Sequence, residues 1–292
     1  MNVAERLGFE AGERVAIIHA DDIGLCDAQS DGGFEALENG PATCGSLMVP
    51  CPGFAAAAKR ACTQPELDLG VHLTLTAEWP SYRWGPLLGP AAVPSLVDAD
   101  GYLPRTAAEV MAKARPEEAE AELRAQITAA LEAGIDVTHL DSHMGTVLFP
   151  SLVTVYARLM HEFRLPGFLL RPDPAALAQL GAEESSVYTE VIDGLEADGW
   201  PVLDGFDADS LHFEPGTGLA HNRARLERLP AGVSYLICHP ARGGDELDSI
   251  VNEAHARDFE RTFYGGEAGR QAIEELGIRS AGMRALRDLV RA

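Results

Sequence analysis

Two adjacent carboxylates close an apolar run near the N-terminus, and such a pair could serve metal or acid–base chemistry. Asp21 and Asp22 lie within residues 15–24, whose sequence is VAIIHADDIG. The run begins with four apolar residues, three of them β-branched, which predicts a fully buried strand. In α/β proteins, chemistry is placed at the carboxyl ends of such strands. The pair alone leaves a structural alternative open, in which one acid caps the next helix and the other is solvated.

Polar side chains also occur at the ends of later apolar segments. They are His72, then His139, Asp141 and His143, then Arg171, and finally His239. A parallel barrel gathers the carboxyl ends of its strands on one face, so we expect these side chains to meet the two acids there. Carboxylate and imidazole ligands suit a divalent metal such as Zn²⁺, Co²⁺, Ni²⁺ or Fe²⁺. One aspartate and two histidines would leave room for water and substrate.

Four segments carry a resemblance to a known family, the YdjC-like carbohydrate deacetylases, which act on N-acetylated sugars. The segments are HADDIG (19–24), GVHLTL (70–75), THLDSH (138–143) and CHPA (238–241). They follow in the order that the family has, and together with the first strand they span most of the chain. The resemblance implies a (β/α)-barrel-like fold and metal-dependent hydrolysis of an amide.

The resemblance also implies a role for each matching residue. Asp22, His72 and His143 would bind one divalent metal ion, which is zinc-like by its ligands, with magnesium left open. Asp21 would be the general base that takes a proton from water activated by the metal, and His239 the general acid for the leaving amine. The chemistry is consistent with these roles, because an acetamide needs an activated water, a polarised carbonyl and a protonated leaving group.

The chain departs from the family after the third segment. Family members often continue it with further histidines, whereas here Met144, Gly145 and Thr146 follow. This change leaves the exact sugar open.

Further residues have roles that the sequence leaves open. Arg171 and Asp141 are candidate substrate-binding residues. Asp141 could instead orient a ligand histidine or cap a loop, and Arg171 could pair with an acid such as Asp21. His19 is expected to be structural and to point to the side opposite Ala20, and Arg257 is expected to form a solvated pair with Asp258. The expected surface histidines are His161, His212, His221 and His255.

Strand and helix patterns alternate at least five times along the chain, which argues for parallel strands with crossover helices. We predict one domain over residues 1–292, an α/β fold built as a (β/α) barrel, incomplete or distorted relative to a TIM barrel. The helix at 116–133 has the clearest limits, with proline in its first turn and glycine after its end. Residues 79–104 form a Pro/Gly/aromatic loop insertion whose aromatics either stack on a sugar or anchor the loop. Residues 175–211 have no clear pattern.

Composition limits the partners. The formal net charge of −22 opposes binding to nucleic acid and to anionic membranes. We find no apolar run of transmembrane length and no signal peptide. Five cysteines without a Cys-x-x-Cys pair predict reduced thiols in a cytoplasmic protein, with Cys238 in the core. The expected partner is a small N-acetylated sugar, and homo-oligomerisation is left open.

Two other functions compete with deacetylation. His139 and Asp141 have the His-x-Asp spacing of a non-haem iron oxygenase, with a distant histidine as third ligand. That triad usually sits on an all-β scaffold, which the strand–helix alternation opposes. A non-catalytic sugar-binding barrel is the third hypothesis. The sequence gives it little support, because all five proposed catalytic and metal-binding groups are present.

Overall fold

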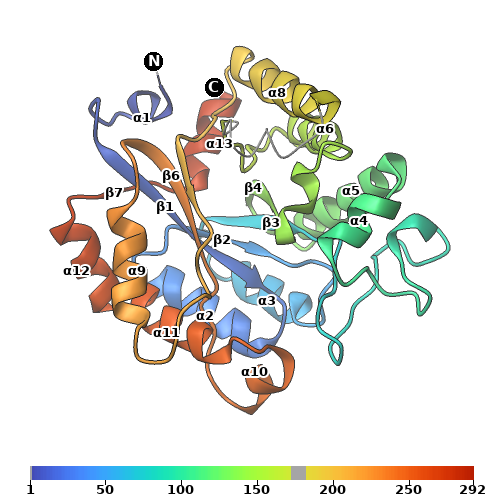
Figure 1. Ribbon diagram of the computed structural model, residues 1–292, viewed down its shortest axis with the longest axis horizontal. Coiled ribbons are helices and arrows are strands. Elements are labelled where there is room, and N and C mark those ends of the chain that lie inside the picture. The colour runs from blue at the N-terminus through green and yellow to red at the C-terminus, as the bar shows by residue number, and fades with distance from the viewer. Residues whose placement is uncertain (1, 172–181) are drawn as a thin grey trace.

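The computed structural model describes residues 2–171 and 182–292. Seven strands form one sheet in the order β4-β3-β2-β1-β6-β5, with β7 beside β1, and every pair is parallel (Figure 1). The strands are β1 (Arg14–Ile23), β2 (Cys44–Leu47), β3 (Leu69–Leu73), β4 (Val137–Ser142), β5 (Gly205–Asp207), β6 (Gly232–Cys238) and β7 (Arg279–Ser280). The longest strand is β1, in which every residue after Arg14 is buried.

Two single bridges link the free edges of β4 and β5 and make the sheet a distorted barrel. Leu140 pairs with Gly167, and Leu170 pairs with Leu203, just before β5. The expected strand at residues 168–171 is thus reduced to isolated bridges. Proline explains part of the distortion, because residues 166 and 201 cannot donate a ladder hydrogen bond. The prediction of a distorted (β/α) barrel is confirmed.

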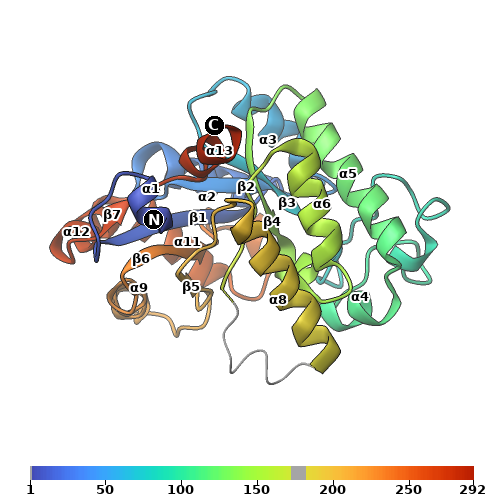
Figure 2. The same cartoon turned by 90° about the horizontal axis from the view of Figure 1, so that it is seen from above.

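Helices cover the outside of the sheet, and α5, α6 and α8 lie side by side on one flank (Figure 2). The α-helices are α1 (Val3–Arg6), α2 (Asp27–Asn39), α3 (Phe54–Ala61), α4 (Ala107–Lys113), α5 (Pro116–Glu132), α6 (Val153–Phe163), α8 (Ala182–Ala197), α9 (Gly218–Glu227), α10 (Asp245–Ile250), α11 (Ala254–Tyr264), α12 (Glu267–Glu275) and α13 (Met283–Arg291). Two 3₁₀ segments, η1 (Pro94–Leu96) and η2 (His143–Leu148), complete the described secondary structure. Among the described residues, no helix combines the length and apolar character that crossing a bilayer requires.

The sequence missed several short elements and one long helix. The missed elements are α1, α4, α10, β5 and α8. Helix α8 falls in the stretch 175–211, whose first residues, 175–181, lie outside the described part of the chain. Strand β5 has only three residues, none of them buried, so it carries no apolar run for a sequence pattern to detect.

The loop insertion at residues 79–104 is anchored by its own aromatic side chains. Trp79 and Trp84 are buried and pack with their ring centroids 5.8 Å apart. The Tyr82 hydroxyl donates a hydrogen bond to the Leu25 carbonyl at 2.9 Å. On the other side, the Glu122 carboxylate of α5 accepts two backbone N–H groups of the loop. Of the two interpretations of these aromatics, the structure supports anchoring.

Candidate active site

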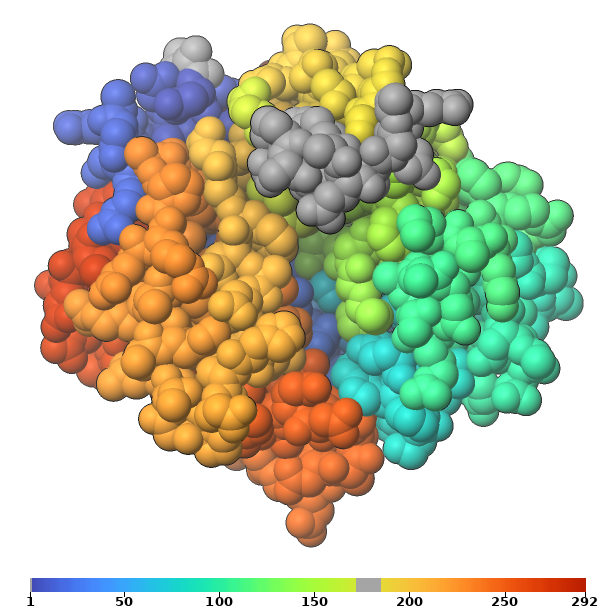
Figure 3. Space-filling model, viewed as in Figure 1, coloured from blue at the N-terminus to red at the C-terminus, as the bar shows by residue number. Residues whose placement is uncertain are grey.

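A pocket of about 390 Å³ opens at the carboxyl ends of the strands. In Figure 3 it lies in the hollow at the middle of the visible face, with blue and teal atoms at its floor. Its lining includes Asp21, Asp22, His72, His143 and His239. The strand-end pattern therefore brought together the five residues that were assigned to metal and catalysis.

Three donor atoms form a nearly equilateral triangle in this pocket. Asp22 Oδ1 lies 3.3 Å from both His72 Nε2 and His143 Nδ1, and the two nitrogens are themselves 3.3 Å apart. Tetrahedral bonds of about 2.0–2.1 Å put two zinc ligands about 3.3 Å apart. Asp22 Oδ1 is buried and has no hydrogen-bond partner, although such atoms are nearly always paired. This donor set fits a divalent metal ion.

A local backbone irregularity turns both acids into the pocket. Neighbouring residues of a regular strand point to opposite faces, so Asp21 and Asp22 could not both do so there. The pairing of β1 with β2 shifts register between Ala20 and Ile23, and Asp22 has a φ of +65°. Aspartate is one of the few side chains that adopt this left-handed conformation without a large penalty.

The two candidate ligand histidines, His72 and His143, each contact a carboxylate through the ring nitrogen that faces away from Asp22. His72 Nδ1 lies 2.8 Å from Asp141 Oδ2, and Ser46 donates a hydrogen bond to the same oxygen at 3.0 Å. Asp141 is 3% exposed, which favours the expectation that it orients a ligand histidine over the one that it binds substrate. His143 Nε2 lies 3.0 Å from Glu78. Glu78 was missed because it follows β3 by several residues, at the edge of the loop insertion.

Arg257 contradicts its predicted place on the surface. It is 4% exposed, and its Nη1 donates to Asp22 Oδ2 and to Gln29 Oε1, both at 2.8 Å. Asp258 binds Arg261 instead. A periodic signal could have revealed Arg257, because the buried residues Glu260 and Tyr264 follow it at helical spacing on the same face of α11.

Burial and these contacts shift the pKa values of the candidate ligand residues. Burial opposes ionisation of Asp22, but His143, His72 and Arg257 together hold the pKa of its carboxyl well below its usual range. Burial opposes the imidazolium form of His143, but Glu78 and Asp22 raise its pKa to about 9. The pKa of His72 is also raised, against its burial, chiefly by Asp141. The neighbouring carboxylates thus favour the protonated form of both imidazoles.

Asp21 lies between the ligand triangle and two further histidines. Its Oδ1 is 2.6 Å from His19 Nδ1, and its Oδ2 is 3.8 Å from His239 Nε2 and 4.0 Å from His72 Nε2. His19, which was expected to be structural, thus contacts the candidate general base. Residues 19 and 21 share a face of β1 because a strand repeats every two residues.

The Nδ1 atom of His239 is held by Ser210 and, through it, by Glu260, two residues that sequence analysis did not identify. Its Nδ1 lies 2.8 Å from Ser210 Oγ, which donates to the buried Glu260 carboxylate. Nε2 is therefore the nitrogen on the side of Asp21. Burial lowers the pKa of His239.

Arg171 is not part of this site. Its side chain is exposed and forms a bidentate ion pair with Glu196 on the surface, rather than with Asp21. The candidate substrate-binding role of Arg171 is therefore withdrawn. The other expectations for surface and core residues hold more closely: His161, His212 and His255 are exposed, His221 is half-buried, and Cys238 is buried. All five cysteines are free thiols.

Comparison with known proteins decides the family. The family model described as YdjC-like protein matches residues 15–275. The chain belongs to the YdjC-like family. It is 40% identical over 241 residues to a carbohydrate deacetylase of Thermus thermophilus, covering 82% of each chain. It is 28% identical over 271 residues to a chitooligosaccharide deacetylase of Yersinia enterocolitica, covering 91% of this chain and 97% of that relative.

A solved structure agrees with the family. This YdjC-like chain is similar to the crystal structure of a putative cellobiose-phosphate cleavage protein from Enterococcus faecalis, with a TM-score of 0.75 and 26% identity. The match covers 94% of this chain and 99% of that one. The described barrel is therefore shared over nearly its full length.

Proposed function

We propose that this protein is a carbohydrate deacetylase that hydrolyses an N-acetyl group with the help of one divalent metal ion. The observation that carries the proposal is the triangle of Asp22 Oδ1, His72 Nε2 and His143 Nδ1, with Asp21 and His239 beside it in the same pocket. The names of the relatives give the acyl-sugar class of substrate.

The chain's own residues supply the proton transfers. A divalent metal held by the triangle would polarise the acetamide carbonyl and lower the pKa of water. Asp21 is fixed by His19 through Oδ1, so its Oδ2 is the oxygen available to take a proton from the attacking water. In its imidazolium form, His239 donates the Nε2 proton to the leaving amine nitrogen, while Ser210 accepts a hydrogen bond from Nδ1–H and holds the ring. Proton transfers of this kind contribute roughly 10²–10⁴-fold each.

The ligand set favours zinc or a neighbouring transition metal. Two imidazole nitrogens and one carboxylate oxygen are typical of zinc sites with an open position. Magnesium prefers octahedral oxygen ligands, so it is the second choice.

The competing oxygenase hypothesis loses its proposed ligand. His139 is fully buried, and its Nε2 and Nδ1 are hydrogen-bonded to His19 and Thr138. The parallel α/β sheet is also unlike the all-β scaffold on which that iron site usually sits.

The pocket has room for more than an acetamide. A second hollow of about 580 Å³ adjoins it and shares Glu78, Met144, His239 and Arg257 with it. The lining of the first pocket also includes an apolar wall, composed of Leu148, Phe168, Phe206, Tyr235 and Ile237. Apolar faces of sugar rings pack on such walls, which supports a sugar larger than one residue or one with an apolar substituent.

The test is acetate release from a panel of N-acetylated sugars, with metal-stripped protein reloaded separately with Zn²⁺, Co²⁺, Ni²⁺, Mn²⁺ and Mg²⁺. We expect metal-dependent release that Asp21→Asn abolishes while the bound metal stays near one per chain. Asp248→Asn, which changes an exposed carboxylate on α10, is the matched control and should keep full activity. Absence of acetate with every metal and sugar would contradict the proposal.

A further inference from the structure

An unbroken chain of hydrogen bonds runs through the interior of the barrel from Asp21 to Asp68. Asp21 Oδ1 lies 2.6 Å from His19 Nδ1, and His19 Nε2 lies 2.8 Å from His139 Nε2. His139 Nδ1 lies 2.8 Å from Thr138 Oγ1, which is hydrogen-bonded to Asp68 Oδ1. The three middle side chains are completely buried, so water does not interrupt the chain.

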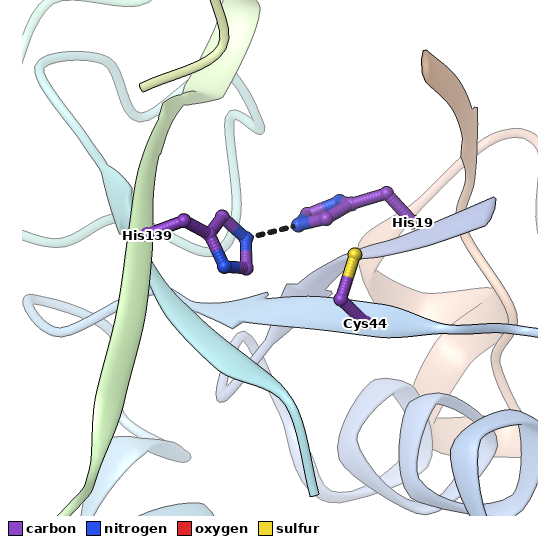
Figure 4. Close-up of side chains that lie close together, drawn as sticks. All are labelled: His19, Cys44 and His139. Atoms are coloured by element: carbon purple, nitrogen blue, oxygen red, sulfur yellow. Dashed lines mark hydrogen bonds between the residues drawn. The ribbon is translucent and has the colours of Figure 1, made fainter. Parts of the chain in front are cut away.

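The contact between the two imidazoles is a hydrogen bond rather than half of a second metal site. Figure 4 shows His19 of β1 and His139 of β4 pointing at each other, with Cys44 of β2 nearby. Their nitrogens are 2.8 Å apart, closer than the roughly 3.3 Å between two ligands of a tetrahedral zinc ion. Burial raises the pKa of the Cys44 thiol well above its usual range, so this thiol keeps its proton.

The backbone leaves a space in which the His139 ring fits. A Cβ built on Gly70 of β3 would come 2.6 Å from ring atoms of His139, which real contacts do not allow. Only glycine at this position lets the imidazole lie across the barrel interior toward His19.

When Asp21 is ionised and both imidazoles are neutral, the hydrogen-bond requirements of the chain permit one arrangement. His19 then donates from Nδ1 to Asp21, so its Nε2 must accept from His139 Nε2–H. His139 Nδ1 is left as an acceptor for the Thr138 hydroxyl, and a protonated Asp68 donates to Thr138 Oγ1. Every donor in this arrangement points from Asp68 toward Asp21, and both imidazoles are neutral.

A second arrangement contains the same number of protons. Asp21 Oδ1–H donates to His19 Nδ1, and His19 Nε2–H donates to His139 Nε2. His139 Nδ1–H then donates to Thr138 Oγ1, whose hydroxyl donates to an ionised Asp68. The two arrangements differ only in that each of four protons has crossed one hydrogen bond.

We propose that Asp68, Thr138, His139 and His19 form a proton-transfer chain that removes from Asp21 the proton it gains in each turnover. The proposal rests on the proposed function of Asp21 as base. In this step, Asp68 first releases its own proton to solvent, and the Asp21 carboxyl turns so that the O–H formed at Oδ2 faces His19. That O–H bond then breaks, an N–H or O–H bond forms and another breaks at each intermediate residue, and an O–H bond forms at Asp68. The net result is one proton moved, with no charge left on the histidines.

Asp68 is placed to pass the proton on to solvent. It precedes β3, at the amino end of the barrel and opposite the pocket, and it is 9% exposed. Its other oxygen, Oδ2, accepts the backbone N–H of Arg284 at 2.7 Å. Burial raises the pKa of Asp68, and burial holds that of His139 well below its usual range. Both directions agree with a carboxyl that can carry a proton and an imidazole that stays neutral.

Two neighbouring acceptors do not interrupt the chain. The Leu69 carbonyl is 3.1 Å from Thr138 Oγ1, a longer contact than those to His139 and Asp68. Asp141 Oδ2 is 3.7 Å from His19 Nε2, beyond hydrogen-bond distance.

Asp68→Asn separates proton transfer from structural support. The amide can donate from Nδ2 to Thr138 Oγ1 and accept from Arg284 through its oxygen, so it keeps the first arrangement but cannot take up a proton. We expect a first turnover at the normal rate, followed by a kcat at least about tenfold lower with KM within about twofold. A kcat equal to that of the unmodified protein would overturn the proposal.

A second variant pair checks the middle of the chain. Thr138→Val removes the hydroxyl with little change in shape and should lower kcat as Asp68→Asn does, whereas Thr138→Ser should restore it. Glu118→Gln is the matched control, because Glu118 is an equally buried carboxylate, 8% exposed, that accepts a backbone N–H outside the chain. If Glu118→Gln lowered kcat as much as Asp68→Asn does, a specific role for Asp68 would be contradicted.

An NMR measurement distinguishes failure of this proposal from failure of the proposed function. With ¹⁵N-labelled histidine, the unmodified protein should show His19 and His139 exchanging between two neutral tautomers, and Asp68→Asn should show only the Nε2–H form of His139. A single, unchanged tautomer in both proteins would overturn the proton-transfer chain. Missing acetate release with the expected NMR result would overturn the role of Asp21 in deacetylation but keep the chain.

Discussion

Asp141 Oδ2 lies 2.8 Å from His72 Nδ1, and this contact leaves Nε2 of the same ring facing Asp22 Oδ1 at 3.3 Å. The carboxylate accepts the Nδ1 proton and thereby fixes the tautomer in which Nε2 has a free lone pair. Asp141→Asn would offer an amide in its place and favour the opposite tautomer. We expect the affinity for zinc to fall by about 10–100-fold, measured by competition with a chromogenic chelator. Unchanged affinity would show that another group fixes the ring.

Glu78 supports the second ligand histidine from the loop insertion. Glu78→Gln removes the charge 3.0 Å from His143 Nε2 and should weaken zinc binding by about tenfold, since such partners raise the basicity of the ligand nitrogen. The zinc affinity of this variant is measured by the same competition titration with a chromogenic chelator. Glu118→Gln, which also removes a carboxylate that contacts this loop, should leave zinc affinity unchanged.

Arg257 neutralises the buried charge of Asp22 from the side away from the histidines. Arg257→Met leaves that carboxylate without its ion pair, and breaking a buried pair from one side costs about 3–5 kcal/mol. We expect a loss of this order in the free energy of unfolding in chelator, measured with urea, and a smaller loss in saturating zinc, because the metal supplies a compensating charge. Equal losses in both conditions would contradict a shared role in balancing Asp22.

Asp68→Asn should also reveal the pH dependence of folding stability. Because burial raises the pKa of Asp68, the folded chain holds this proton more tightly than the unfolded chain does. The resulting stabilisation is complete below the unfolded pKa of about 3.9 and is lost as pH rises through the folded pKa. Thermal unfolding should therefore give Asp68→Asn a Tm at or above that of the unmodified protein at pH 7, with the difference shrinking toward pH 4. A markedly lower Tm at pH 7 would show that the ionised carboxylate stabilises the fold.

Phe206 presents an exposed ring to the apolar wall of the pocket. It is 43% exposed, and its centroid is 4.7 Å from that of Phe168. Phe206→Ala should raise KM for the preferred sugar about tenfold with little change in kcat, because the ring contributes about 0.5–1.5 kcal/mol of packing beyond its area. Leu219→Ala alters an exposed apolar residue outside the pocket lining and should leave KM unchanged. A fall in kcat alone would place Phe206 in the chemical step.

The sequence pattern was sufficient for the barrel and for the residues at its strand ends. Val15 and its neighbours form a strand whose burial needs only a run of apolar side chains, and parallel topology then places His72 and His143 beside Asp22. The distortion of the barrel depends on how segments 166–170 and 203–207 pair with each other. This pairing is a contact between distant residues, so no local sequence pattern predicts it.

The missing parts of the site depend on contacts between residues distant in the chain. Glu78 and Arg257 touch the ligands only after the loop insertion and α11 have packed. His19 was expected to be structural because it precedes the two acids, although its two-residue spacing to Asp21 already placed both side chains on one face of β1. Arg171 was predicted to lie at the site because it follows an apolar segment. That segment pairs through a single bridge at Leu170, and the Arg171 side chain forms an ion pair with Glu196 on the surface.

The barrel is joined at Gly167 and Leu170 by single bridges, so the free energy of local opening should be lower on this side than on the other. The pair β1 and β6 has an unbroken ladder from Arg14 to Ala20, whereas this side has one bridge per junction. Amide hydrogens of residues 167–170 should therefore exchange with deuterium through smaller openings than those of β1. The candidate ligands Asp22, His72 and His143 lie on β1, on β3 and directly after β4. If they bind the proposed metal, we expect the part of the apolar wall at Phe168 to widen for bulkier sugars while these three residues keep their spacing.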